Sequence, residues 1–215
     1  MFPKLFVVLA VLTVLPQVCL ALDEEREPAL KYSLEINGQR HEILLDTPTE
    51  LKGAFENPKV TLTASPTREF SFGAVKFEYP ANFTWEANLK TPDLKFWIMS
   101  GNDFKIMYFI HDEGYTLETH VESMIEQFGK TNTVVTESQR KLGGRIYKGR
   151  NLRLTIANTK INQEAYVFAA KGMTRLIILQ DSAEEADGSD EGRKTMELLS
   201  RTFVDAATAK AAEKK

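Results

Sequence analysis

The sequence is poor in cysteine and histidine, and each scarcity excludes a kind of chemistry. Cys19 is the only cysteine among 215 residues, so the chain cannot form an internal disulfide. The three histidines, His41, His111 and His120, do not reproduce the helical H-E-x-x-H zinc motif. The serines lie outside the G-x-S-x-G elbow of serine hydrolases. We therefore expect no metal ion, no cofactor and no catalytic residue identifiable by motif.

The chain also lacks an apolar run of about 20 residues, the length that a membrane-spanning helix needs. Its longest run, Leu5 to Leu15, follows the positive charge of Lys4 and precedes Cys19-Leu20-Ala21. This order predicts a secretory signal peptide over residues 1–21, cut after Ala21. An uncleaved anchor is the alternative. Cleavage would leave 215 − 21 = 194 residues without cysteine, and we expect a secreted or periplasmic protein.

Excess positive charge is absent as well. The chain has 27 basic and 30 acidic residues, and removal of the signal peptide takes Lys4 away, so the remaining charge is 26 − 30 = −4. This mild acidity argues against nucleic acid as a partner. A hydrophobic fraction of 43% is typical of a globular protein, and the length is sufficient for one packed core.

Most of the chain alternates apolar and polar residues, which is the pattern of half-buried strands. The clearest case is residues 32–45, where two alternating runs flank Asn37-Gly38, a pair typical of a tight β-hairpin turn. A third strand is expected over residues 60–64. Further strands are expected over residues 68–80, 94–99, 104–110, 133–142, 145–157, 164–170 and 173–181.

Two segments carry helical signals instead. The stretch HDEGYTLETHVESMIEQFG, residues 111–129, is rich in carboxylates and contains two histidines. Its apolar residues recur at helical spacing, Thr116 is suited to the N-cap, and Gly129 to the C-terminal stop. We interpret it as a helix packed on the core, with His120 at the edge of its apolar face. Residues 189–204 predict a second helix, with Ser189 as its N-cap.

These elements predict an α+β fold, an antiparallel β-sheet flanked by helices. From about residue 67 to 204 their order resembles the Mog1/PsbP-like family. The features that carry the resemblance are the opening FSFGAVKFEYPANF, a strand hairpin with Trp97, a helix in mid-domain, a strand meander and a terminal helix ending in LLSRTF. The resemblance implies an α/β/α sandwich. Members are generally non-catalytic binding or assembly factors, some of them exported to oversee large protein complexes, which implies a binding role.

The expected organisation has four parts. They are a signal peptide (1–21), an N-terminal β-hairpin extension (22–66), the α+β Mog1/PsbP-like domain (67–205) and a flexible tail (206–215).

Charge is segregated along the second half of the chain. No acidic residue occurs from Ser138 to Gln163, whereas residues 181–191 are acidic. We predict a basic strip that binds a partner, formed by Arg140, Lys141, Arg145, Lys148, Arg150 and Arg153. An acidic protein or an anionic membrane surface would suit it. The alternative is a solvated face whose charge the acidic segment balances.

The leading functional hypothesis is an exported, non-enzymatic binding or assembly module acting on a protein partner or envelope complex. One alternative is a hydrolase built around Asp112, Glu113 and His120, and another is a carrier that holds a small apolar ligand between sheet and helix. Trp85 is a candidate exposed aromatic. Asn82, in the sequence NFT, is a candidate N-glycosylation site.

Overall fold

A computed structural model describes residues 25–45, 47–53, 56–112, 114–157, 159–170, 172–182 and 188–206. The predicted signal peptide and residues 207–215 of the predicted tail lie outside these ranges. The elements in chain order are β1 (Lys31–Ile36), β2 (Gln39–Leu44), β3 (Val60–Ala64), β4 (Thr67–Phe72), β5 (Val75–Pro80), β6 (Thr84–Asn88), β7 (Leu94–Ser100), β8 (Phe104–Asp112), α1 (Leu117–Phe128), the 3-10 turn η1 (Lys130–Asn132), β9 (Thr133–Leu142), β10 (Arg145–Ile156), β11 (Thr159–Ala170), β12 (Met173–Asp181), α2 (Asp190–Thr202) and β13 (Val204–Asp205).

The strands form three antiparallel sheets. The main sheet has seven strands in the order β6-β7-β8-β12-β11-β10-β9. It consists of two meanders, β6 to β8 and β9 to β12, which join where β8 pairs with β12. A small sheet has the order β13-β5-β4, and a third has the order β2-β1-β3.

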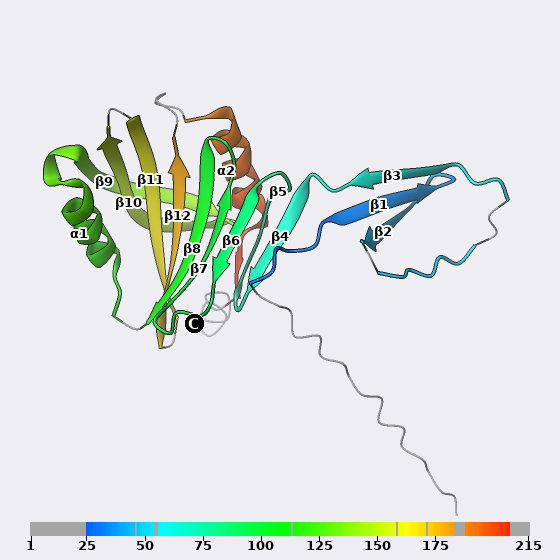
Figure 1. The fold of residues 1–215 in the computed structure, drawn as a ribbon, viewed down its shortest axis with the longest axis horizontal. Coiled ribbons are helices and arrows are strands. Elements are labelled where there is room, and N and C mark those ends of the chain that lie inside the picture. The colour runs from blue at the N-terminus through cyan, green and yellow to red at the C-terminus, as the bar shows by residue number, and fades with distance from the viewer. Residues whose placement is uncertain are drawn as a thin grey trace, which may run out of the picture.

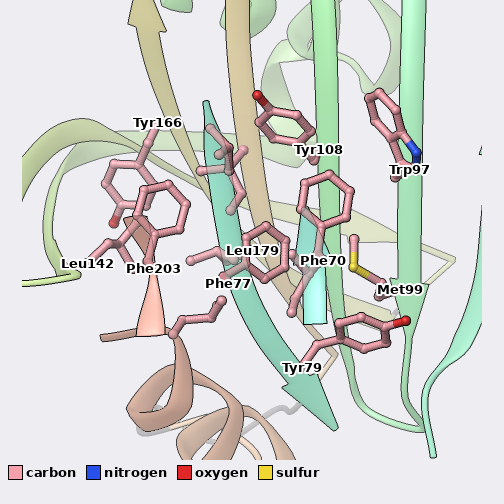
Figure 2. Close-up of a cluster of buried hydrophobic side chains, with 14 of the residues drawn as sticks. Phe70, Phe77, Tyr79, Trp97, Met99, Tyr108, Leu142, Tyr166, Leu179 and Phe203 are labelled. Atoms are coloured by element: carbon pink, nitrogen blue, oxygen red, sulfur yellow. The ribbon is translucent and has the colours of Figure 1, made fainter. Parts of the chain in front are cut away.

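The main sheet buries one face, here called the core face, against the small sheet and α2. Alternate residues of β7 and β8, including Trp97, Met99, Ile106 and Tyr108, point toward β4 and β5 and are at most 1% exposed. Figure 2 shows Trp97, Met99 and Tyr108 beside Phe70 and Tyr79 of the small sheet. The Phe70 ring, for example, stacks on Phe77 and meets Tyr108 edge-on. Trp97 is therefore part of the core.

The opposite face of the main sheet, here called the α1 face, is covered in part by α1. The helix lies beside β9 and β10 in Figure 1. Its apolar residues Leu117, Val121 and Met124 pack on a cluster centred on Leu152 and Leu154. The Thr116 hydroxyl accepts from the amide of Thr119, and the Gly129 amide donates to the carbonyl of Ile125. The predicted helix and both of its end signals are confirmed.

The fold class predicted from the sequence is wrong. The described residues are 55% strand and 17% helix, with three sheets and two helices, so the fold is not an α/β/α sandwich with helices flanking the sheet. The physical reason is that two helices are too few to cover both faces of seven strands. On the core face, the β4–β5 hairpin supplies much of the apolar cover that a helical layer would give.

A buried ion pair joins the end of the described chain to the main sheet. Arg175 on β12 donates from Nη1 to Oδ1 of Asp205 on β13 at 3.1 Å, and the two side chains are 4% and 0% exposed. The guanidinium also lies over the Phe168 ring, 5.5 Å from its centroid. Burial raises the pKa of the neighbouring Tyr108, although the positive charge of Arg175 lowers it in part.

The sheet of β1, β2 and β3 projects away from the rest of the molecule, and we call it the arm (Figure 1). The predicted hairpin is confirmed, because β1 and β2 pair antiparallel from Lys31 with Leu44 to Ile36 with Gln39. The turn between them has positive φ at Asn37 and Gly38, as a tight hairpin of right-handed strands requires. The predicted third strand pairs with β1 on its other side.

None of the helices described is both long and apolar enough to cross a membrane.

Candidate functional site

A cleft of about 680 Å³ opens on the core face of the main sheet, beyond the edge of the small sheet. Its floor is formed by one end of the β9 to β12 meander, and its wall by the start of α2. The volume is within the usual range for ligand-binding pockets, about 300–1,000 Å³. We call it the α2 cleft.

The floor of the α2 cleft consists of polar side chains that lie opposite one another on β10 and β11. Asn151 lies opposite Glu164, Arg153 opposite Asn162, and Thr155 opposite Lys160. The intervening Leu152 and Leu154 are buried in the cluster beneath α1. Side chains along a strand point to alternate faces, so the residues between the apolar ones point into the cleft, and here they are polar.

The wall of the cleft is fixed by a carboxylate at the start of α2. Asp181, the last residue of β12, accepts from the amide of Ser189 at 3.0 Å and from its hydroxyl at 3.1 Å. The Ser189 hydroxyl in turn accepts from the Gly192 amide, as an N-cap does. A Cβ on Gly192 would collide with the Asp181 carboxylate and the Phe104 ring, so glycine allows this close approach. The predicted N-cap at Ser189 is confirmed.

One acidic side chain on the floor is already neutralised. Both oxygens of Glu164 accept from Arg140 of β9, across β10, and its Oε2 also accepts from the Tyr166 hydroxyl at 2.6 Å. The Tyr166 hydroxyl reaches Ser138 as well, at 2.8 Å. A Cβ on Gly149 would collide with the Ala165 carbonyl and the Tyr166 ring, so this network needs glycine there. Hydrogen bonding to Glu164 raises the pKa of Arg140.

Two positive charges at the cleft have no such partner. Arg153 and Lys160 are exposed, and neither forms an ion pair with any residue that the structure describes. They occupy diagonal positions on neighbouring strands, which places their β-carbons about 7–8 Å apart. Beside them, the Oδ1 atoms of Asn151 and Asn162 are buried and accept no hydrogen bond within the described part of the chain. The cleft therefore combines free positive charge with unsatisfied amides.

The predicted basic strip does not exist as one surface. Arg140, Arg145 and Arg153 lie on the core face of the main sheet, whereas Lys141, Lys148 and Arg150 lie on the α1 face. Only Arg140 and Arg153 line the α2 cleft. Arg150 instead forms an ion pair with Glu118 of α1, at 3.5 Å. The alternation of side chains along β9 and β10 separates residues that are neighbours in the sequence.

Trp85 is half-buried rather than an exposed aromatic. Its indole N–H donates to the carbonyl of Glu25 at 2.9 Å. Its ring lies against Phe70 and Tyr79, with centroids 6.1 Å away in each case. The side chain therefore contributes to the core and holds the start of the described chain against β6. Asn82 lies exposed in the turn between β5 and β6.

Two of the three histidines, His111 and His120, form a packed cluster with Tyr115 on the α1 face, away from the α2 cleft, whereas His41 lies in β2 of the arm. The ring of His111 stacks on Tyr115 with centroids 3.7 Å apart, and the Tyr115 hydroxyl lies 3.3 Å from Nδ1 of His120. His120 is 6% exposed. Burial, assisted by the nearby His111, lowers its pKa to about 4. Burial also lowers the pKa of His111, against the opposing effect of Asp112.

This arrangement does not provide the site of the hydrolase hypothesis. His120 is a buried residue of α1, and Asp112 is exposed at the end of β8. Glu113 lies outside the described residues. Within the ranges described, no group of three or more histidine, cysteine, aspartate or glutamate side chains could hold a metal ion.

The space between sheet and helix, expected by the carrier hypothesis to hold a ligand, is occupied by side chains. Met107, Phe109 and Val167 of the sheet, for example, pack there with the apolar residues of α1. The α2 cleft lies on the other face, and its floor carries the polar rows described above.

Comparison with models of known protein families finds no match, and a search of curated proteins finds none with significant similarity. The resemblance to the Mog1/PsbP-like family therefore remains a prediction from the order of elements.

The predicted strip did not include the cleft's own polar set, namely Asn151, Lys160, Asn162, Glu164 and Arg193, although Lys160 belongs to the same acid-free segment as the strip. A signal for the first four was present. The odd positions from 151 to 155 and the even positions from 160 to 164 are all polar, which marks one polar face at one end of a sheet.

Proposed function

We propose that this protein is a non-enzymatic binding module whose α2 cleft holds an acidic segment of a partner protein. The observation that supports this proposal is the pair of unpaired cations, Arg153 and Lys160, beside the buried and unsatisfied amides of Asn151 and Asn162. A carboxylate placed there would accept hydrogen bonds from the guanidinium and the ammonium group. Charge-assisted hydrogen bonds of this kind are about twice as strong as neutral ones.

The unsatisfied amide oxygens of Asn151 and Asn162 are acceptors, so they support a ligand that carries N–H donors as well as negative charge. A buried amide that lacks a partner carries a cost of about 1–3 kcal/mol. Each asparagine side chain offers both an acceptor oxygen and a donor N–H₂ group. A peptide segment supplies both kinds of partner from its backbone, in addition to acidic side chains, which is why we favour it over a simple anion.

Binding is favoured over catalysis because the carboxylates of the cleft are already engaged. Its two carboxylates, Glu164 and Asp181, are engaged by Arg140 and by Ser189. Among the described residues that line it, none is histidine or cysteine. Arg153 and Lys160 carry positive charge at neutral pH and suit recognition of an anion rather than proton transfer.

The cleft also stands out from the overall charge of the protein. The chain is acidic as a whole, with a net charge of −3, so the cations at the cleft mouth are a local exception. An acidic partner would be attracted to this region, which favours one orientation of approach.

The test is a titration of the chain from Leu22 onward into a fluorescently labelled peptide that contains four glutamates. We expect Arg153→Gln combined with Lys160→Gln to weaken binding by about tenfold or more, since each lost charged hydrogen bond is worth about 1.5–3 kcal/mol. The matched control is Lys141→Gln combined with Lys148→Gln. It makes the same change in charge on the α1 face, and we expect less than about a twofold effect.

Two further measurements test whether charge drives the binding and whether the ligand is a peptide or a small anion. Raising the salt from about 50 to about 300 mM should weaken peptide binding, because both cations are exposed to solvent. In the second measurement, free glutamate or phosphate competes with the labelled peptide for the cleft. If either small anion binds as tightly as the peptide, the cleft is a small-anion site and the peptide proposal is wrong. Equal losses in the cleft variant and the control would show that only overall charge matters, which would also contradict it.

A further inference from the structure

The arm exposes an unusual sheet edge. Its order is β2-β1-β3, so β2 and β3 are both edge strands. All five residues of β3 are exposed, and Val60 and Leu62 are 53% and 58% exposed. The β3 sequence, Val-Thr-Leu-Thr-Ala, carries no charge and no proline. By contrast, β2 carries Arg40 and Glu42. Natural proteins protect sheet edges with charges, prolines or bulges, and β3 contains neither a charge nor a proline.

The backbone of β3 has hydrogen-bonding groups that point away from the arm. Asn37 donates to the carbonyl of Lys59 at 2.9 Å, and Ser65 donates to the carbonyl of Lys31 at 2.8 Å. In an antiparallel pair, hydrogen-bonded and non-hydrogen-bonded positions alternate. The odd-numbered residues of this segment therefore bond to β1. The even-numbered residues Val60, Leu62 and Ala64 direct their N–H and C=O groups outward.

The edge is complementary to a second copy of itself. If β3 pairs antiparallel with β3 of another molecule about Leu62, then Leu62 lies opposite Leu62 of the second copy. Val60 then lies opposite Ala64, and Thr61 opposite Thr63. All the outward-pointing residues fall at hydrogen-bonded positions. Apolar residues meet apolar residues on one face, and threonines meet threonines on the other, and both kinds of cross-strand pair are favourable.

The faces of the two arms would also match. Tyr32, Leu34 and Ile36 of β1 lie opposite Ala64, Leu62 and Val60, so they share the apolar face of the arm. A two-fold axis perpendicular to the sheet keeps this face on the same side in both copies. The apolar strips then become continuous across the junction. No like charges come together at the junction, since Val60–Ala64 is uncharged.

We propose that the partner for this edge is a second copy of the chain, and that two arms join through β3 into one six-stranded antiparallel sheet. This surface is separate from the α2 cleft and does not depend on the function proposed for it. Isologous pairing of this kind closes on itself, so the product is a dimer rather than a fibre.

The test is sedimentation velocity of the chain from Leu22 onward over a range of concentrations, for the native sequence and for two variants. Leu62→Pro removes an N–H that the pairing with β1 does not use, and proline is tolerated at such an edge position. We expect it to raise the dimer dissociation constant by about tenfold or more. The control Leu62→Val keeps the N–H group and should still dimerise.

A charge exchange tests the register directly. Leu62→Glu and Leu62→Lys each place like charges opposite each other in the homodimer, so each alone should be monomeric. Mixed together, they should form a heterodimer, because opposite charges then meet at the two-fold axis. The proposal is wrong if the native chain stays monomeric up to about 100 µM. It is also wrong if Leu62→Pro dimerises like the native chain, or if mixing the charged variants produces no heterodimer. A dimer that survives every Leu62 change uses another surface.

Discussion

Replacing Asp205 with alanine would leave the Arg175 guanidinium buried without the carboxylate it pairs with. The pair is almost completely shielded from water, with exposures of 4% and 0%. Removal of one partner from a buried pair costs about 3–5 kcal/mol, mainly because the remaining charge is uncompensated. We expect Asp205→Ala to reduce the free energy of unfolding by this amount. Arg175→Met keeps the apolar stem over the Phe168 ring and leaves the carboxylate behind, and we expect a similar loss.

The double variant separates this reasoning from a simple loss of contacts. If the penalty of each single variant comes from the orphaned charge, then removing both charges avoids it. Arg175→Met combined with Asp205→Ala should therefore lose less stability than either single variant, because both buried charges are gone. The two single losses add to about 8 kcal/mol. A double variant that loses no more than about 4 kcal/mol then gives a coupling energy of about 4 kcal/mol or more, above the usual range for residues in contact.

The assay is equilibrium unfolding in urea, followed by tryptophan fluorescence, because Trp97 lies in the core at 1% exposure. The slopes of the transitions must agree among the variants for their free energies to be compared. Losses that simply add in the double variant would refute the argument from uncompensated charge. Single losses below about 1 kcal/mol would show that water reaches the pair in solution.

Two further predictions concern other buried groups. The pKa of His120 is about 4 in the folded chain against an ordinary 6.5, so the unfolded chain binds more protons between these values and stability falls as the pH is lowered through that window. The loss of stability approaches about 3 kcal/mol near pH 4. The control is His120→Gln, whose stability should not depend on pH in this way and which should still bind the peptide. Equal pH profiles of the two proteins would contradict the prediction. Gly149→Ala should cost about 1–3 kcal/mol, since the new methyl group forces β10 and Tyr166 apart. The control is Lys148→Ala at the exposed neighbouring residue, whose free energy of unfolding should stay within about 0.5 kcal/mol of the native value in the same urea assay. Equal losses in the two variants would contradict the steric explanation.

The elements of this fold were largely readable from the sequence, whereas their assembly was not. Alternation located the strands except β6 and β13, and Asn37-Gly38, Thr116 and Ser189 marked a turn and two helix starts. Alternation does not specify which strand a strand pairs with. It could not show that β4 and β5 leave the main sheet and pack across its core face. The helical cover was therefore overestimated, and the predicted sandwich was wrong.

The candidate site was predicted only in part, for a different reason. The basic strip was inferred from closeness along the chain, although Arg140 and Lys141 are consecutive strand residues and must face opposite ways. Applying the alternation rule to charge would have separated the two sets from sequence alone. The pairing of Glu164 with Arg140 across β10 could not be predicted, because it depends on register and on the space left by Gly149.

The order of strands in the main sheet has a consequence for how fast the protein folds. Each meander can form from neighbouring hairpins, but the pairing of β8 with β12 joins distant parts of the chain. Its nearest partners in sequence, Asp112 and Met173, are 173 − 112 = 61 positions apart, and Phe104 and Asp181 are farther apart still. Closing so long a loop has a large entropic cost before any hydrogen bond in that seam is made. We therefore expect the pairing of β8 with β12 to be the rate-limiting step of folding. Destabilising substitutions in β12 should then slow folding, whereas those in the β6–β7 hairpin should mainly speed unfolding.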